Sequence, residues 1–264
     1  MECTTANGIV LHTLRDGPTE ATTLVFANSI DTDARVWDRV IGRLGGRFHT
    51  LRYDKRGHGL SETPAGPYTI DDHVADLAGL FEALGIGRAV VVGLSVGGMI
   101  AQGLAAARPA LVAGLVLCDT ARRIGPPEMW DQRIAAIRAG GIAALAEPIL
   151  ERWFSAAFRA RRPEELAGWR AMLTRTPVEG YLGICAAIRD ADLTAAARGI
   201  AVPTLCLVGS EDGATPPALV RELAGLIPGA RCHEIAGAGH LPCVEAPDEV
   251  AGLIQGFVAG LETA

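Results

Sequence analysis

The sequence predicts an α/β fold in which a mostly parallel sheet is covered by helices on both faces. Short runs rich in β-branched and apolar residues alternate with segments of helical periodicity along most of the chain. Such alternation is typical of parallel sheets, because each crossover helix covers one face of the sheet. With 264 residues, of which 49% are hydrophobic, the chain suits one full α/β domain that carries an insertion.

Seven runs have the composition of strands: residues 9–14, 22–27, 50–53, 89–92, 111–118, 204–208 and 231–235. Helical patterns cover residues 37–44, 70–84, 99–107, 219–226 and 249–261. The first two runs are joined by the turn sequence Asp16-Gly17-Pro18, and we expect them to form an antiparallel hairpin.

The alternation stops between residues 122 and 197, where three or four helical segments follow one another and no strand is predicted. We expect these residues to form a helical cap inserted between the sixth and seventh strands, and residues 1–121 and 198–264 to form the core domain. An insertion at this point lies over the carboxyl ends of the strands, where α/β sheets bind ligands.

The composition argues against several classes of function. A net charge of -6 and a pI near 5.5 do not favour nucleic-acid binding. Met1-Glu2-Cys3-Thr4 lacks the features of a signal peptide, and no apolar run approaches the ~20 residues of a membrane span. We therefore expect a cytoplasmic protein. The six cysteines are scattered without metal-ligand spacing, so neither a metal nor another cofactor is predicted.

The segment Gly93-Leu94-Ser95-Val96-Gly97 lies between the run 89–92 and a helical pattern. A serine between two glycines at a strand-to-helix junction is typical of a nucleophile elbow, where the tight turn leaves no room for a Cβ two residues to either side. We therefore predict Ser95 as a nucleophile.

A serine hydroxyl needs a base, and the base needs a carboxylate that orients it. His240 follows the last predicted strand in a glycine-rich loop, and Asp212 follows the preceding strand, which is the chain order Ser, Asp, His of this architecture. His58 is the alternative base. Asp119, at the end of an earlier strand, and Glu211 are the alternative acids.

The oxyanion that forms on attack by Ser95 needs preorganised donors. The backbone N–H of Val96 is the first candidate, because it follows the nucleophile. The second donor is expected from the loop after the run 22–27, with the Ile30 N–H favoured and that of Ser29 as the alternative.

Several segments, spread over essentially the whole chain, carry a family resemblance. They include Phe26-Ala27-Asn28-Ser29-Ile30, Trp37-Asp38, residues 51–61, the elbow segment 93–102, residues 117–121, Met129-Trp130-Asp131, Gly180-Tyr181, residues 188–193 and residues 212–217. Together they resemble the α/β-hydrolase fold superfamily and, more narrowly, the 3-oxoadipate enol-lactonases of the β-ketoadipate pathway.

The resemblance implies a small-molecule substrate, 3-oxoadipate enol-lactone, which is a five-membered enol ester with a carboxylate. Ser95 would attack the lactone carbonyl while His240 takes its proton, and water would then release 3-oxoadipate from the acyl-enzyme. Two alternatives remain open. One is a broader carboxylesterase or perhydrolase that acts on neutral esters, and the other is a non-hydrolytic biosynthetic relative or binder.

A substrate carboxylate needs a cation, because burying it unpaired is costly. Arg133 shares a predicted apolar helix face with Trp130, and we expect it to bind the carboxylate. Alternatively, its head pairs with Asp131 or Glu147. Trp130, Trp153 and Asn28 are the other candidate pocket residues.

Asp31 departs from the family pattern, in which glycine usually occupies this position. A carboxylate about 6 Å from the oxyanion would oppose it by ~3 kcal/mol at an effective dielectric of about 20. The charge would be harmless if Asp31 turned to solvent or paired with an arginine such as Arg35.

Overall fold

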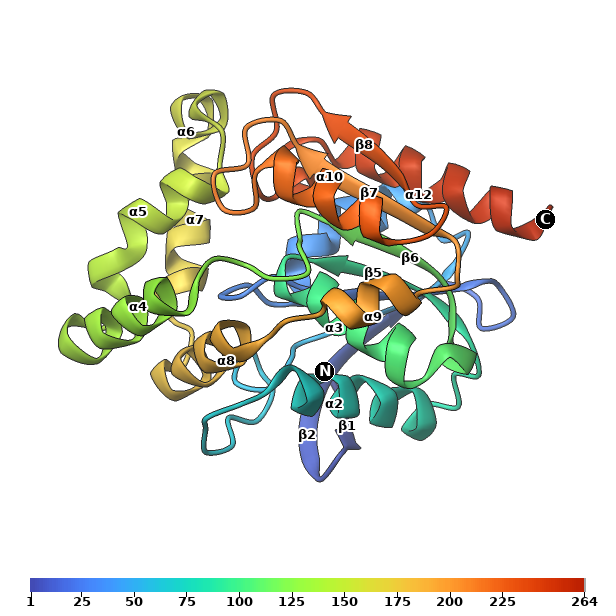
Figure 1. The fold of residues 1–264 in the computed structure, drawn as a ribbon, viewed down its shortest axis with the longest axis horizontal. Coiled ribbons are helices and arrows are strands. Elements are labelled where there is room, and N and C mark those ends of the chain that lie inside the picture. Colours follow the sequence, from blue (N-terminus) through green and yellow to red (C-terminus); the bar gives the residue numbers. More distant parts are fainter. Residues whose placement is uncertain (264) are drawn as a thin grey trace.

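The computed structural model describes residues 1–263. Its centre is an eight-stranded sheet of order β1-β2-β4-β3-β5-β6-β7-β8 (Figure 1). The strands are β1 (Glu2–Ala6), β2 (Ile9–Asp16), β3 (Thr23–Ala27), β4 (His49–Tyr53), β5 (Ala89–Leu94), β6 (Val112–Cys118), β7 (Thr204–Gly209) and β8 (Arg231–Ile235). In the part of the sheet with the order β4-β3-β5-β6-β7-β8, every strand is parallel to its neighbours. The predicted α/β fold with a mostly parallel sheet is therefore confirmed.

The amino-terminal hairpin differs from the prediction. β2 pairs antiparallel with β1 and with β4, whereas β3 lies between β4 and β5 and is parallel to both. The expected hairpin between residues 9–14 and 22–27 is therefore wrong. The hairpin turn is instead Asn7-Gly8, where both residues have the positive φ that such short turns require.

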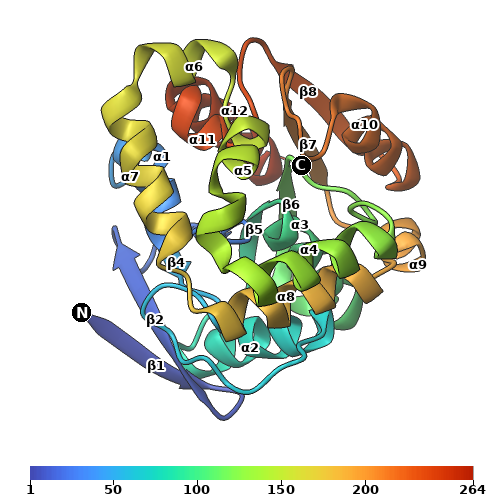
Figure 2. The same ribbon diagram turned by 90° about the vertical axis from the view of Figure 1, so that its left-hand side faces the viewer.

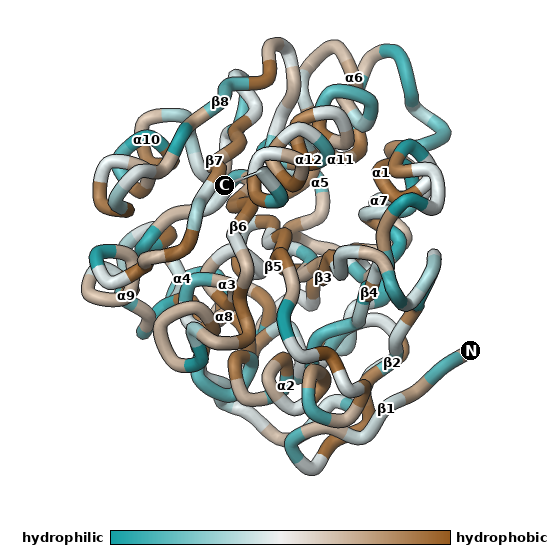
Figure 3. The backbone as a smooth tube through the Cα atoms, turned by 90° about the vertical axis from the view of Figure 1, so that its right-hand side faces the viewer, coloured by the Kyte–Doolittle hydropathy of each residue, from teal (hydrophilic) through white to brown (hydrophobic). Residues whose placement is uncertain are grey.

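Helices cover both faces of the sheet. α1 (Asp38–Leu44) and α12 (Pro247–Glu262) pack together on one face, with α11 (Pro242–Glu245) beside them. The other face carries α2 (Ile70–Ala83), α3 (Val96–Ala107) and α10 (Pro217–Leu226). The central strands are buried on both faces, as their continuous apolar character predicts, and Figure 3 shows these hydrophobic strands at the centre of the molecule.

A series of helices occupies the chain between β6 and β7. These are α4 (Pro127–Gly140), α5 (Ala146–Trp153), α6 (Ala156–Arg161), α7 (Pro163–Thr174), α8 (Val178–Asp190) and α9 (Thr194–Gly199). There are more of them than the three or four segments expected. α4 to α8 gather beyond one end of the strands (Figure 2), whereas α9 packs on α3 and α10. Three short 3₁₀ segments are η1 (Ala34–Trp37), η2 (Pro109–Leu111) and η3 (Ile142–Leu145).

With β1 counted, this helical insertion lies between the sixth and seventh strands. The sequence pattern missed β1 because its burial pattern is mostly exposed and its residues are largely polar. Within residues 1–263 no helix is both long and apolar enough to cross a membrane.

Candidate active site

The turn between β5 and α3 holds Ser95 in a conformation that is unusual for a residue with a side chain, with φ of 57° and ψ of -120°. Its N–H donates to the Cys118 carbonyl at 2.9 Å, which fixes the turn to β6. A Cβ added to Gly97 would lie 2.2 Å from the Ala27 carbonyl oxygen, and one added to Gly93 would lie 2.4 Å from the Gly97 carbonyl oxygen. The steric argument for the two glycines therefore applies at both positions.

His240 and Asp212 form a buried hydrogen-bonded pair. The Nδ1 atom of His240 lies 2.9 Å from Oδ2 of Asp212, which also accepts a hydrogen bond from the Thr215 hydroxyl at 2.6 Å. Although burial raises the pKa of Asp212, the charge and hydrogen bond of His240, together with bonds from Thr215, lower it to about 2. Asp212 is thus an anion at neutral pH that can orient the imidazole.

Ser95 and His240 line one cavity, together with Ile30, Trp130, Arg133 and Trp153. Since Nδ1 of His240 faces Asp212, Nε2 is the ring nitrogen left to accept a proton from a nucleophile. The structure therefore brings a serine hydroxyl, an imidazole and an ionised carboxylate to the same end of the sheet.

The alternative base His58 and the alternative acid Glu211 are not among the residues that line this cavity. His58 is buried in the turn after β4, where its Nδ1 lies 3.1 Å from the Arg56 carbonyl oxygen, and it does not line the cavity. Glu211 is exposed. Neither is placed to act with Ser95.

Asp119 lies next to the predicted acid. One ligand atom each from Asp119, Asp212 and His240 lie within 4.8 Å of one another, a spacing that a metal ion would also accept. The Asp119 Oδ1 atom accepts a hydrogen bond from the Gly209 N–H at 2.9 Å, while its Oδ2 has no partner among the described residues. Burial, followed by the charge of Asp212, raises the pKa of Asp119 well above its usual value. The pKa values of the two neighbouring carboxyl groups are therefore shifted in opposite directions.

The oxyanion loop, residues 28–32, follows β3 and supplies Ile30 to the cavity. Within residues 1–263 the backbone N–H groups of Ile30 and Val96 donate to no protein acceptor. Both groups remain available to a developing negative charge.

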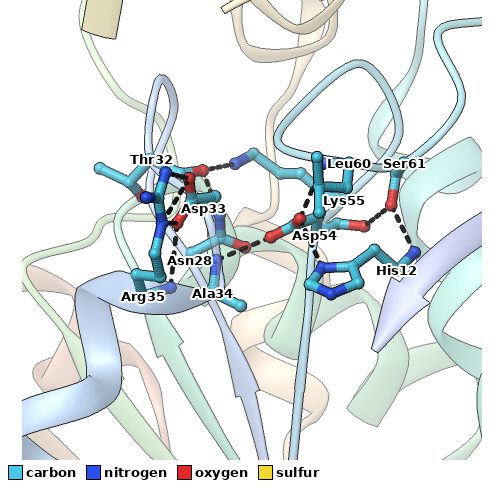
Figure 4. A network of polar contacts seen from close by, with 10 residues as sticks. All are labelled: His12, Asn28, Thr32, Asp33, Ala34, Arg35, Asp54, Lys55, Leu60 and Ser61. Carbon is cyan, nitrogen blue, oxygen red and sulfur yellow. Dashed lines mark hydrogen bonds and ion pairs between the residues drawn. The ribbon is translucent and has the colours of Figure 1, made fainter. Parts of the chain in front are cut away.

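A buried lysine braces this loop (Figure 4). Lys55 Nζ donates to the Ser29 carbonyl. It also donates to the Thr32 carbonyl at 3.3 Å, and Asn28 Nδ2 donates to the same Thr32 oxygen, as Figure 4 shows. The Thr32 hydroxyl donates to the Ser29 carbonyl at 3.0 Å. The loop conformation is therefore fixed by side chains on both sides of Ile30. No role was assigned to Lys55 from the sequence, although it is the single lysine of the chain.

Asp54 ties the loop to the neighbouring strands in the same network (Figure 4). It accepts hydrogen bonds from the backbone N–H groups of Ala34 and Leu60 at 2.7 and 2.9 Å, and it lies 2.8 Å from His12 Nδ1. The Ser61 hydroxyl donates to the Asp54 carbonyl at 2.5 Å. These contacts hold the two loops after β3 and β4 together.

The Arg133 guanidinium is a cation in the cavity. It stacks over the rings of Trp130 and Tyr181, with its central carbon 5.3 and 5.5 Å from the ring centroids. Among residues 1–263 it has no carboxylate within ion-pair distance, because the acidic side chains on neighbouring helices pair with other arginines. Burial lowers the pKa of Arg133, but the Tyr181 hydroxyl and the charge of Asp31 outweigh this and raise it.

The two proposed partners of Arg133 are occupied by other arginines. Asp131 pairs with Arg189 at 2.9 Å, and Glu147 pairs with Arg170 at 2.6 Å. The alternative in which the Arg133 head pairs with Asp131 or Glu147 is therefore wrong.

A second arginine lines the cavity and was missed by sequence reasoning. Arg152, at the end of α5, donates from Nε to the Gly213 carbonyl at 3.1 Å. Burial, and then repulsion by Arg133, lowers its pKa. No periodicity distinguishes this exposed arginine from others on the same helices, although it precedes the predicted pocket residue Trp153.

The other predicted pocket residues have different surroundings. Trp130 and Trp153 are buried and line the cavity, and the Trp130 Nε1–H donates to the Ile124 carbonyl at 2.6 Å. The Asn28 side chain is directed into the oxyanion loop through its bond to Thr32 and does not line the cavity.

Asp31 neither turns to solvent nor pairs with Arg35. The Arg35 guanidinium lies 2.6 Å from the Asp33 carboxylate. Asp33 is also the N-cap residue of η1, where its side chain accepts a hydrogen bond from the Arg35 N–H. Asp31 itself is 1% exposed. Neither solvent nor Arg35 therefore relieves the charge of Asp31.

Comparisons with known proteins agree with this architecture. The alpha/beta hydrolase family model matches residues 24–253. The curated 3-oxoadipate enol-lactonase 2 of Acinetobacter baylyi is 31% identical over 92% of this chain and 91% of its own length. The crystal structure of the enol-lactonase from Burkholderia xenovorans LB400 is 41% identical, with a TM-score of 0.95 over 98% of this chain and 100% of that one. A malate-bound thermophilic esterase from Thermogutta terrifontis is 29% identical, with a TM-score of 0.92 over 98% of both chains.

The fold and these similarities define an enzyme that hydrolyses ester bonds. The chain belongs to the alpha/beta hydrolase family, and its predicted resemblance to 3-oxoadipate enol-lactonases is confirmed.

Proposed function

We propose that this chain hydrolyses a carboxylate-bearing lactone, 3-oxoadipate enol-lactone, through Ser95, His240 and Asp212. The observation that carries the proposal is the guanidinium of Arg133, which makes no ion pair among the described residues and lines the cavity shared by Ser95 and His240. An arginine without a carboxylate partner is well suited to a substrate carboxylate, which it can bind through two parallel hydrogen bonds. The similarity to enol-lactonases supports this substrate.

In the proposed mechanism, Ser95 Oγ attacks the lactone carbonyl carbon and its proton passes to Nε2 of His240. Asp212 stabilises the imidazolium, and the Ile30 and Val96 N–H groups bind the oxyanion. The ring C–O bond breaks, the enolate leaves with the proton from His240, and the enol becomes a ketone. Water, deprotonated by His240, then attacks the acyl-enzyme, and Ser95 leaves with that proton.

The core and the helical cap divide these tasks in the proposal. Residues 1–121 and 198–264 supply the nucleophile, base, acid and oxyanion donors. The cap, residues 122–197, supplies Arg133 and Trp130 from α4 and Trp153 from α5. Substrate selection is therefore assigned mainly to the cap.

The second candidate is a carboxylesterase for neutral esters, with the same three catalytic residues. The buried Asp31 favours it, because a carboxylate near the oxyanion loop disfavours an anionic substrate. The similarity to the Thermogutta terrifontis esterase is compatible with it.

Steady-state kinetics of Arg133→Met distinguishes the two candidates. For the enol-lactone we expect KM to rise about 10- to 100-fold, as loss of a charge-assisted pair predicts, with kcat less affected. For p-nitrophenyl acetate, which is neutral, KM should change less than about threefold. Arg138→Met is the matched control, since Arg138 is exposed on the same helix and does not line the cavity.

Ser95→Ala should reduce both activities about 10⁶-fold. If Arg133→Met leaves the KM for the enol-lactone unchanged, or if the wild type prefers the neutral ester, the neutral-ester function replaces the proposed one. Residual activity of Ser95→Ala near the wild-type level would refute both.

A further inference from the structure

Asp31 has an environment that packing alone does not explain. It follows Ile30 in the oxyanion loop, is 1% exposed and has φ of 60°, a backbone conformation that side chains rarely adopt. Neither of its carboxylate oxygens has a hydrogen-bond partner among residues 1–263. Burying a carboxylate without donors is strongly unfavourable, so the charge of this group must be compensated by other means.

The charged and titratable groups that face Asp31 come from three elements. They are Lys55 after β4, Arg133 on α4, and Tyr181 and Cys185 on α8. Lys55 Nζ already donates to the Ser29 and Thr32 carbonyls. Burial lowers the pKa of Lys55 to about 7, although the charges of Asp31, Asp54 and Asp33 oppose the shift.

Of these groups, Arg133 is the cation that makes no ion pair among the described residues. It is held between the Trp130 and Tyr181 rings, and the Tyr181 hydroxyl lies close enough to both Asp31 and Arg133 to shift their pKa values. A charge on Asp31 therefore acts mainly on the guanidinium assigned to the substrate.

Burial raises the pKa of Asp31 to about 7, although Arg133, Lys55 and Tyr181 oppose the shift. Ionised and neutral Asp31 are therefore both populated near neutral pH. The ionised form is a counter-ion for Arg133, whereas the neutral form leaves Arg133 to an external carboxylate.

We propose that Asp31 is a specificity-determining residue that competes with the substrate carboxylate for Arg133, so that a carboxylate-bearing ligand binds together with a proton on Asp31. The proton comes from solvent when the ligand binds and returns to solvent when it leaves. This inference rests on the proposed function only in placing a carboxylate at Arg133.

The test compares two inhibitors of similar shape and different charge, hexanoate and hexanamide. Each is measured as a competitive inhibitor of p-nitrophenyl acetate hydrolysis between pH 6 and pH 8, a range in which hexanoate stays ionised. If only the protein with neutral Asp31 binds the anion, the Ki of hexanoate should rise about tenfold from pH 6 to pH 8. The Ki of hexanamide should stay constant.

Asp31→Asn keeps the shape of the side chain, and asparagine tolerates positive φ well. In this variant the Ki of hexanoate at pH 8 should equal the wild-type value at pH 6. Asp31→Gly should behave in the same way and serves if Asp31→Asn folds poorly. Asp33→Asn is the matched control, because its carboxylate lies in the same loop but pairs with Arg35. It should retain the tenfold dependence.

Three results would overturn the inference. If the Ki of hexanoate for the wild type does not change with pH, Asp31 does not compete with the ligand carboxylate for Arg133. A pH dependence that persists in Asp31→Asn assigns the titration to a group other than Asp31. If the Ki of hexanoate in Asp31→Asn does not change with pH but stays as high as the wild-type value at pH 8, the control of hexanoate binding is assigned to Lys55 instead of Asp31. Because the assay uses a neutral ester, it is informative even if the enol-lactone proves not to be the substrate.

Discussion

Replacing Asp119 with asparagine should leave ester hydrolysis nearly unchanged, whereas the same change at Asp212 should abolish most of it. The two carboxyl groups lie side by side and both are buried. Only one of them is predicted to carry the charge that orients His240. The pair of variants therefore tests which acid serves the catalytic base.

The magnitude follows from the separation of the groups. Two unit charges within 4.8 Å of each other repel by at least about 3.5 kcal/mol at an effective dielectric of about 20, which favours a state with only one charge on the two carboxyl groups. Asp212 accepts hydrogen bonds from Thr215 and interacts with His240, so it keeps the negative charge. Asp119 has one donor, the Gly209 N–H, and burial together with the charge of Asp212 raises its pKa, so it is the carboxyl group of the pair that we predict to be protonated.

The assay is kcat for p-nitrophenyl acetate at pH 7, with thermal unfolding of the same variants. We expect Asp212→Asn to lose roughly 10⁴-fold in kcat, because the wrong imidazole tautomer is stabilised. Asp119→Asn should stay within about threefold of the wild type, since it replaces a neutral acid with a neutral amide that still accepts from Gly209.

The stability of Asp119→Asn should depend on pH with a definite sign. A carboxyl whose folded-state pKa is raised costs stability as pH rises above its unfolded pKa, because only the unfolded chain releases the proton. Asparagine removes this cost. The melting temperature of Asp119→Asn relative to the wild type should therefore increase between pH 4 and pH 7. Equal losses of activity in the two variants, or a difference in melting temperature that shrinks with pH, would refute the assignment.

The remaining predictions concern the supports of the site. Gly97→Ala should cost about 3 kcal/mol in unfolding free energy, because its Cβ would lie 2.2 Å from the Ala27 carbonyl oxygen. Denaturant unfolding measures this, and Gly252→Ala, where the Cβ meets no atom within 4 Å, should be neutral or stabilising. Lys55→Met should lower kcat for p-nitrophenyl acetate about tenfold with little change in KM, since the oxyanion loop loses its brace. An unchanged kcat in Lys55→Met would contradict that role. An equal fall in kcat in Arg47→Met, a control at an exposed position, would contradict it as well.

Local sequence predicted most of the sheet and the elbow because the signals for both are contiguous. Apolar runs separated by helical patterns correspond to β2 to β8, and the Gly-x-Ser-x-Gly segment lies at the junction of β5 and α3. Strand pairing was less accessible, since β4 inserts beside β2 and separates it from β3. That register depends on residues about 40 positions apart along the chain, which a turn signal at residues 16–18 does not report.

The candidate site divides in the same way. Chain order after successive strands was enough to select Asp212 and His240, and helical spacing was enough to select Arg133. The neighbours of these groups depend on the tertiary structure. Arg152 reaches the cavity from another helix, and Asp119 meets Asp212 across adjacent strands.

By itself the sequence determined the type of fold and the position of the turn that holds Ser95, and it predicted the order of the proposed partners Asp212 and His240, because short-range periodicity, glycine spacing and strand ends are encoded locally. Only the tertiary structure decided which charges are paired. Asp131 and Glu147 are taken by other arginines, Asp33 takes Arg35, and Arg133 is left free beside the buried Asp31. The physical reason is that ion pairing and desolvation depend on distances between distant segments, which packing sets and no local pattern contains.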